Sequence, residues 1–155
     1  MKLYPELSVK GLTLATLRVV LATYFCFGFL LYVRQDAYIF MPPRTLMEDC
    51  PELSDAEIVS IDGTRAYFLT SGTSTRLAVI YHGNASTACS NASLARLFLL
   101  RGWNVLSVEY AGYSGDTEHT PSVALLRKDV DHIDRWVKAE PYTEVLIVGR
   151  SVGSG

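Results

Sequence analysis

The feature that most constrains this chain is an apolar run near its beginning, residues 12–33, in which Arg18 carries the only charge. A helix needs roughly 20 apolar residues to cross a bilayer, and this run is long enough. A cleaved signal peptide would have a shorter apolar core and a small-residue cleavage site, and a buried core helix would have a polar face. The run therefore predicts a transmembrane helix at about 12–33, within an N-terminal anchor at 1–37.

The flanks of the run predict how it would lie in a bilayer. Arg18 is near one end, where a long side chain can reach the headgroups, and Tyr32 and Tyr38 follow at the other end like an interfacial aromatic belt. The Lys and Arg residues near the two ends favour a cytoplasmic N-terminus by a margin of one. We therefore expect a single-pass membrane protein whose partner is the lipid bilayer. A formal net charge of −2 gives no reason to expect a nucleic-acid partner.

The cysteines and sequons leave the compartment open. We expect Cys26 to pack inside the apolar run, whereas Cys50 and Cys89 could pair in an oxidising lumen. Asn-x-Ser tripeptides begin at Asn84 and Asn91, but such tripeptides are common by chance.

The segment that follows the anchor changes character twice. Residues 38–55 contain three prolines and little periodicity, which predicts a linker. Two short apolar runs then flank Asp62-Gly63, a strong signal for a two-residue hairpin turn. We expect antiparallel strands near Glu57–Ile61 and Thr64–Thr70.

From Arg76 onward, apolar strands alternate with segments of helical spacing. In chain order these are a strand at 76–83, a helix at 89–100, a strand at 103–110, a helix begun by Thr120 and Pro121, and a strand at 144–149. The second helix carries an apolar stripe that we expect to face a sheet: Val123, Leu126, Val130, Ile133 and Val137. Residues 56–155 therefore predict an α/β domain, a β-hairpin followed by β-α-β-α-β with right-handed crossovers.

The last strand leads into Gly149-Arg150-Ser151-Val152-Gly153, which matches G-x-S-x-G. A sharp strand-to-helix turn of this kind strains its central residue, and the positions two residues away must be small. The serine then projects at the carboxyl end of the sheet, where α/β folds bind ligands. The pattern predicts Ser151 as a catalytic nucleophile, Gly149 and Gly153 as the elbow positions, and the N–H of Val152 as an oxyanion donor.

A glycine-rich turn without catalytic role shares this pattern, whereas a phosphate loop would need a Lys followed by Ser or Thr after the last glycine. The loop His82-Gly83-Asn84, directly after the first parallel strand, favours catalysis, because hydrolases of this architecture take their second oxyanion N–H there. We expect that donor from Gly83 or Asn84. We expect His82 to orient the loop, because a triad histidine in this topology follows the nucleophile.

The segments "YHGNAS", "VEYAGYSG" and "GRSVGSG" resemble, in this order, the signatures of the α/β-hydrolase superfamily. They most resemble those of its membrane-anchored, Bem-type abhydrolase-domain group, over about Tyr38 to Gly155. The resemblance implies a serine hydrolase that cleaves an ester, thioester or amide without a cofactor or a metal ion. The substrates it implies are small-molecule lipid esters and acylated proteins.

The sequence departs from that family in two places and at its end. Ala111 replaces an arginine of the family's second segment, and Ser86 stands where relatives often have glycine. The family's acid and histidine follow the serine, so both are expected beyond Gly155, and we expect His119 and His132 to be solvated. These features predict the N-terminal part of an α/β-hydrolase sheet behind a transmembrane helix, truncated after the nucleophile elbow. The alternative is a catalytically inactive, truncated or degenerate copy that acts as a membrane-tethered binding module.

Overall fold

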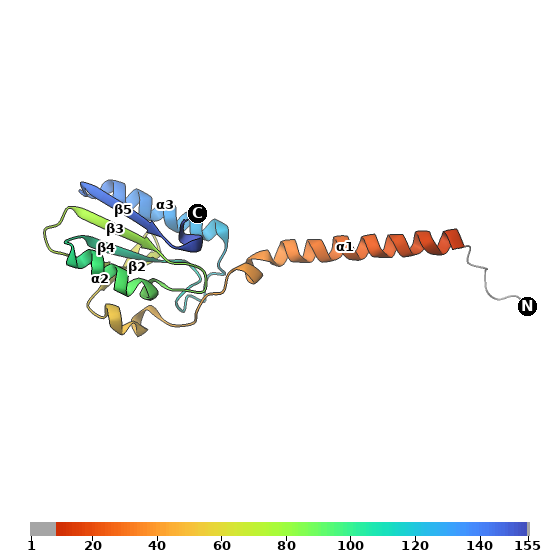
Figure 1. The fold of residues 1–155 in the computed structure, drawn as a ribbon, viewed down its shortest axis with the longest axis horizontal. Coiled ribbons are helices and arrows are strands. Elements are labelled where there is room, and N and C mark those ends of the chain that lie inside the picture. Colours follow the sequence, from red (N-terminus) through yellow and green to blue (C-terminus); the bar gives the residue numbers. More distant parts are fainter. Residues whose placement is uncertain (1–8, 155) are drawn as a thin grey trace, which may run out of the picture. The chain divides into compact units, whose positions relative to one another are not determined.

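The computed structural model describes residues 9–154 and divides the chain into two compact units, one ending at Tyr38 and the other beginning at Ile39. The first unit contains most of helix α1, Val9–Ile39 (Figure 1). The helix extends beyond the predicted 12–33 at both ends and stops shortly before Pro42, since proline disfavours helical backbone in the residue before it. No residue of α1 is buried, and the helix is long and apolar enough to cross a membrane, a test that a signal sequence also passes.

The second unit is built on a five-stranded open sheet in the order β1-β2-β4-β3-β5. Its strands are β1 (Glu57–Ile61), β2 (Thr64–Leu69), β3 (Arg76–Tyr81), β4 (Asn104–Glu109) and β5 (Glu144–Gly149). The hairpin β1–β2 is antiparallel, β2 pairs antiparallel with β4, and β3 runs parallel to β4 and β5. Asp62 and Gly63 adopt φ values of 51° and 92°, as the predicted two-residue turn requires.

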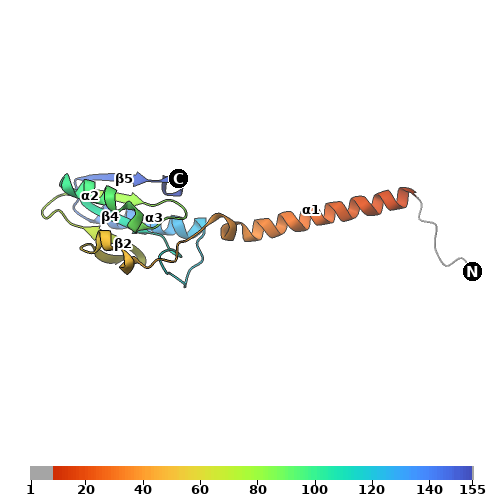
Figure 2. The ribbon, with the colours of Figure 1, turned by 60° about the horizontal axis from the view of Figure 1, so that its bottom comes forward.

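Two helices cover opposite faces of this sheet. Helix α2 (Ala92–Leu100) packs on the face that carries Ile80 and Val105, and α3 (Val123–Ala139) packs on the face that carries Val79 and Leu106. Alternate residues of one strand thus serve two cores, which is why the strands are nearly continuously apolar. Figure 2 shows β5 at one edge of the sheet. The side chain of Ile147 in β5 is 67% exposed.

Helix α3 differs from its prediction in two details. Ser122, and not Thr120, is the N-cap, and its hydroxyl accepts a hydrogen bond from the N–H of Leu125 at 3.2 Å. Leu126 and Ile133 of the expected stripe are buried, but Val123 and Val130 are 48% and 40% exposed. The helix instead buries two polar residues of the neighbouring face, Asp129 and His132.

The segment between α1 and β1, expected as a linker, is packed against the domain. It forms two short 3₁₀ turns, Met47–Asp49 and Pro51–Leu53, and its buried side chains are Phe40, Met47, Cys50 and Leu53. The Tyr67 hydroxyl donates a hydrogen bond to the carbonyl of Met47. Cys50 and Cys89 form a disulfide across 39 positions of sequence, which ties the segment to the turn before α2.

Candidate active site

The backbone at Ser151 adopts a left-handed conformation. This residue directly follows β5 and Arg150 and opens the short 3₁₀ turn Ser151–Ser154, and its φ is +53°. A non-glycine residue in the left-handed region costs of order 1–3 kcal/mol, and such residues cluster at functional sites. The side chain of Ser151 is exposed. This is the conformation that a strand-to-helix turn imposes on a nucleophile.

The glycines on either side of Ser151 are required by close packing. A Cβ at Gly149 would lie 2.1 Å from the carbonyl oxygen of Gly153, and a Cβ at Gly153 would lie 2.7 Å from the carbonyl oxygen of His82. Neither position accepts a side chain without movement of the backbone. The tight approach explains why the sequence repeats glycine at this spacing.

The loop after β3 lies directly against this turn. A Cβ built on Gly83 would lie 3.4 Å from the Cβ of Ser151 and 3.3 Å from the carbonyl oxygen of Arg150. The N–H of Arg150 donates to the carbonyl of Tyr81 at 3.2 Å. The structure thus brings Gly83 and Ser151 together, with Val152 next in the turn, where the first N–H groups of a helical turn lack internal acceptors.

Asn84, the third residue of this loop, uses its side chain for structure. Its Oδ1 accepts from the N–H groups of Met41 and Ala85, both at 3.0 Å, and its Nδ2 donates to the carbonyl of Ile39 at 2.5 Å. Asn91, the other sequon asparagine, is buried. A glycan on either asparagine would therefore disturb the folded domain.

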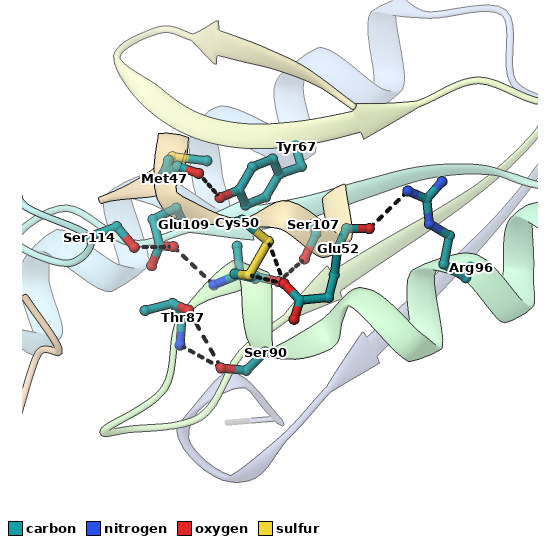
Figure 3. Close-up of a disulfide and its surroundings, with 12 residues drawn as sticks. Met47, Cys50, Glu52, Tyr67, Thr87, Ser90, Arg96, Ser107, Glu109 and Ser114 are labelled. Atoms are coloured by element: carbon teal, nitrogen blue, oxygen red, sulfur yellow. Dashed lines mark hydrogen bonds between the residues drawn. A yellow bond between two sulfur atoms is a disulfide. The ribbon is translucent and has the colours of Figure 1, made fainter. Parts of the chain in front are cut away.

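A buried pair of polar side chains, His82 and Glu109, packs beneath this loop. His82 and Glu109 are fully buried, and Nε2 of His82 lies 2.8 Å from Oε1 of Glu109, without the alignment of a good hydrogen bond. The other Glu109 oxygen accepts from the N–H of Ala88 at 2.9 Å and from the Ser114 hydroxyl at 2.6 Å (Figure 3). Nδ1 of His82 faces the Gly83 carbonyl at 2.8 Å. His82 is therefore enclosed on both nitrogens and is a structural residue.

The other two histidines differ from each other. His119 is exposed and pairs with Asp116 at 2.9 Å, as expected of a solvated residue. The expectation was wrong for His132, which is 8% exposed and lies 3.0 Å from the Thr64 hydroxyl. Among residues 9–154, no histidine is hydrogen-bonded to Ser151.

Asp129 completes this second buried polar group. It accepts from the Thr64 hydroxyl at 2.7 Å and from the N–H of Ala111 at 2.9 Å. Burial raises its pKa above the ordinary value, although these hydrogen bonds and the neighbouring His132 act in the opposite direction. Asp129 holds the loop after β4 at Ala111.

Two tyrosines that the sequence did not single out lie against His82, and a third stacks on one of them. The ring centroids of Tyr110 and Tyr113 lie 4.5 and 5.0 Å from that of His82, and Tyr81 stacks on Tyr110. Burial raises the pKa of Tyr113 to about 12, with a further contribution from Glu109. The Tyr113 hydroxyl therefore stays protonated at physiological pH and donates to Oδ1 of Asn84 at 2.9 Å.

An apolar cavity of about 360 Å³ opens beside the serine turn. Its lining is mainly apolar, with Phe40, Tyr110, Val123, Leu126 and Val152, and also includes the charged residues Arg127 and Asp131. A volume of this size is at the lower end of those that hold small-molecule ligands. A second cavity of about 470 Å³ lies between α3 and β5.

One side-chain cluster in the described part of the chain has the composition of a metal site. The sulfurs of Cys50 and Cys89 and a carboxylate oxygen of Glu52 lie within 4.8 Å of one another. Figure 3 shows that the two sulfurs are bonded to each other. A disulfide does not supply the thiolates that a metal needs, so this cluster does not form a metal centre in its present state.

Comparison with known proteins supports an esterase-like fold. No family model and no curated protein matches the chain. The chain is similar to an esterase of Pyrococcus furiosus, Pf2001, in three crystal forms, at 19% identity and TM-scores of 0.56, 0.54 and 0.54. The matches cover 75%, 73% and 73% of this chain and 48%, 47% and 49% of the esterase, so the chain spans about half of that protein's length. At this identity the likeness establishes the fold alone, a mixed α/β fold similar to that of this esterase.

Proposed function

We propose that this chain carries the membrane anchor and the nucleophile of a serine hydrolase of the membrane-anchored, Bem-type abhydrolase group, acting on ester or thioester substrates. The observation that carries the proposal is Ser151 at φ +53° between two glycines that tolerate no side chain, with Gly83 beside it. The esterase-like fold supports it independently. The proposed substrates are lipid esters and acylated proteins, and the apolar cavity at Phe40 and Val152 suits an acyl chain.

In the proposed reaction, the Ser151 hydroxyl attacks the substrate carbonyl carbon and loses its proton to a base. The N–H of Val152 and an N–H of the Gly83–Asn84 loop stabilise the resulting oxyanion. Collapse of this intermediate breaks the ester or thioester bond and releases the alcohol or thiol, which takes up the proton. Water then cleaves the acyl-serine to the carboxylic acid and restores Ser151. Residues 9–154 place no histidine on Ser151, so the base is proposed to come from outside them.

The proposed location is a single-pass membrane protein with a cytoplasmic N-terminus and the second unit on the opposite side. The disulfide Cys50–Cys89 supports this orientation, because disulfides persist in oxidising compartments and are rare in the cytosol. Protease protection in sealed vesicles tests it. If the second unit lies in the lumen, the protease should cleave it only after the vesicle membrane is opened.

The alternative proposal is a membrane-tethered binding module without catalysis. The observation that favours it is the lack of a histidine hydrogen bond to Ser151 within the described residues. Hydrolysis of p-nitrophenyl acyl esters by the full-length protein, meaning the protein with the proposed base that lies outside residues 9–154, decides between the two proposals, with Ser151→Ala and the exposed control Ser60→Ala. The hydrolase proposal predicts activity that Ser151→Ala reduces to background and Ser60→Ala retains. Equal activity in both variants, or none in the unmodified protein, contradicts it.

A further inference from the structure

The loop that would supply the second oxyanion donor is itself strained. Ala85, one residue after Asn84, has a φ of +52° although it carries a Cβ. Such a conformation persists only where surrounding contacts determine it more strongly than the local preference. The N–H of Ala85 donates to Oδ1 of Asn84 at 3.0 Å, which fixes the orientation of the peptide plane that enters Ala85.

The Asn84 side chain is in turn fixed by groups far away in sequence. Tyr113 donates to the same Oδ1 at 2.9 Å, and the N–H of Met41 donates at 3.0 Å. Nδ2 of Asn84 donates to the carbonyl of Ile39, the last residue of α1. These partners allow the amide group only one orientation. Reversing it would place its N–H₂ group against two backbone N–H groups and a hydroxyl.

The segment that receives these bonds is anchored in the core. Phe40 lies between Ile39 and Met41, is 5% exposed, and packs in the cluster that contains Tyr110 and Tyr113. Phe40 and Val152 also line the same cavity. The chain that leaves α1, the loop after β3 and the serine turn therefore meet at one place.

We infer that Asn84 is a positioning residue: its side-chain amide holds Ala85 in the left-handed conformation and ties the oxyanion loop to Ile39–Met41. The inference rests on the proposed function, which makes this loop an oxyanion loop. In it, the side chain of Asn84 sets the loop's geometry, while the backbone N–H groups contact the substrate. Loss of the side chain lets Ala85 relax and moves a donor away from Ser151.

Labelling of Ser151 by a fluorophosphonate in the full-length protein tests this inference. For Asn84→Ala we expect the maximal labelling rate to fall about 10- to 100-fold, somewhat less than complete loss of one oxyanion donor. The probe concentration for half-maximal rate should stay within about twofold, because apolar contacts are unchanged. Asn91→Ala is the matched control, a buried asparagine in the same Asn-Ala-Ser context, and should label at the unmodified rate.

The double variant Asn84→Ala/Ala85→Gly separates positioning from general packing. Glycine adopts a positive φ without a supporting contact. We therefore expect the double variant to recover most of the rate that Asn84→Ala loses, although both proteins lack the amide. Recovery to within about fivefold of the unmodified rate supports the inference. A double variant as slow as Asn84→Ala, or an Asn84→Ala protein as fast as the unmodified one, overturns it.

If the unmodified protein is not labelled at Ser151, the proposed function fails and hydrogen exchange judges the positioning role. Faster exchange at the backbone amides of both Ala85 and Met41 in Asn84→Ala, with the Asn91→Ala protein unchanged, supports the tie between loop and segment. Unchanged exchange at Met41 overturns it.

Discussion

The chain turns at both ends of the parallel strands, and the residues that adopt a positive φ in these turns differ between the two ends. At the amino ends of β3 and β4, the residues with positive φ are Gly72 and Gly102, which adopt it without a Cβ penalty. At the carboxyl ends, positive φ falls also on Ala85, Ser114 and Ser151, which carry side chains. These side-chain-bearing residues lie at the edge where α/β folds bind ligands, and this supports the site proposed there.

The polar groups at the two ends differ in the same sense. At the amino edge, the Asn104 side chain accepts from the N–H of Ser71 and donates to the carbonyl of Ser74, both at 2.8 Å. At the carboxyl edge, a fully buried histidine and glutamate, His82 and Glu109, lie 2.8 Å apart. The hydrogen bonds of Asn104 are made at one edge, whereas at the other Nε2 of His82 and Oε1 of Glu109 lie buried without a well-aligned hydrogen bond beneath a strained loop.

The largest expected effect comes from the buried pair. Glu109→Ala removes the acceptor of the Ala88 N–H and the Ser114 hydroxyl and leaves Nε2 of His82 without its neighbour. We expect a loss of about 3–5 kcal/mol of unfolding free energy, because each buried polar group left unpaired costs about 1–3 kcal/mol. Asn104→Ala, its counterpart at the amino edge, should cost about 1–3 kcal/mol, the penalty of unpaired neutral groups. Denaturant unfolding of the full-length protein in detergent, followed by tryptophan fluorescence, compares the two. A larger loss for Asn104→Ala would reverse the proposed difference between the edges.

The disulfide is expected to have the next largest effect. It closes a loop of 39 positions, so Cys50→Ala/Cys89→Ala should lower stability by about 2–4 kcal/mol through the freedom gained by the unfolded chain. The same denaturant assay measures this change. A dithiol reductant should shift the unmodified protein toward the double variant and leave the double variant where it is. Identical stabilities of variant and unmodified protein would show that the bridge does not hold the 40–55 segment.

Matched glycine substitutions compare the edges directly. Gly149→Ala places a Cβ 2.1 Å from a backbone oxygen, and we expect a cost of about 1–3 kcal/mol together with loss of fluorophosphonate labelling. Gly72→Ala has open space around its Cβ and should cost only about 1 kcal/mol for its positive φ, with labelling retained. Retained labelling in Gly149→Ala would show that the turn does not need its close approach.

The smallest expected effect is a pH dependence at the carboxyl edge. The pKa of Asp129 is raised by burial, so the folded state holds its proton more tightly than the unfolded state. Folding is therefore favoured by Asp129 at low pH, and this contribution is lost as pH rises from the ordinary value of 3.8 through the folded pKa. We therefore expect the unfolding free energy of the unmodified protein to fall, relative to that of the Asp129→Asn protein, as the pH rises through this range. A difference that grows in favour of the unmodified protein with rising pH would contradict the burial of Asp129.

Asp116 is an internal control, because its pKa is shifted in the opposite direction and its effect on stability should have the opposite pH dependence. Burial acts to raise its pKa, but hydrogen bonds from the N–H groups of Gly112 and Glu118 and from His119 outweigh burial, and the pKa is lowered. Its contribution to stability is present above about 3.8 and is lost as pH falls through the folded pKa. Asp116→Asn should therefore remove stability near neutral pH and have less effect in acid.

Local patterns were sufficient to predict the strands and the serine turn. The dipeptide Asp62-Gly63 predicts the hairpin that the structure contains. The glycines at 149 and 153 predict a close approach of backbone segments, which the structure shows. The burial of His132 could not be predicted in this way. Its partner Thr64 lies 68 residues earlier, so the contact does not affect the hydrophobic periodicity of the α3 sequence. A heptad-like apolar stripe favours Val123 and Val130, but in the structure the helix buries Leu126 and Ile133 of that stripe together with the neighbouring Asp129 and His132.

The segment at 38–55 illustrates the same limit. Its prolines predict the absence of a long helix or strand, and the structure contains short 3₁₀ turns there. That Phe40 and Met47 are core residues depends on contacts with the loop after β3 and with β2, which composition does not encode. The role of the Asn84 side chain was missed for the same reason, because its partners lie more than 25 residues away on either side.

Peptide mapping of the full-length protein after fluorophosphonate treatment tests the central claim most directly, namely that the strained turn presents Ser151 as a nucleophile. We predict one adduct, on the peptide that contains Ser151, and its loss in Ser151→Ala but not in Ser60→Ala. An adduct on another serine that persists in Ser151→Ala, or no adduct on the folded protein, would contradict the claim.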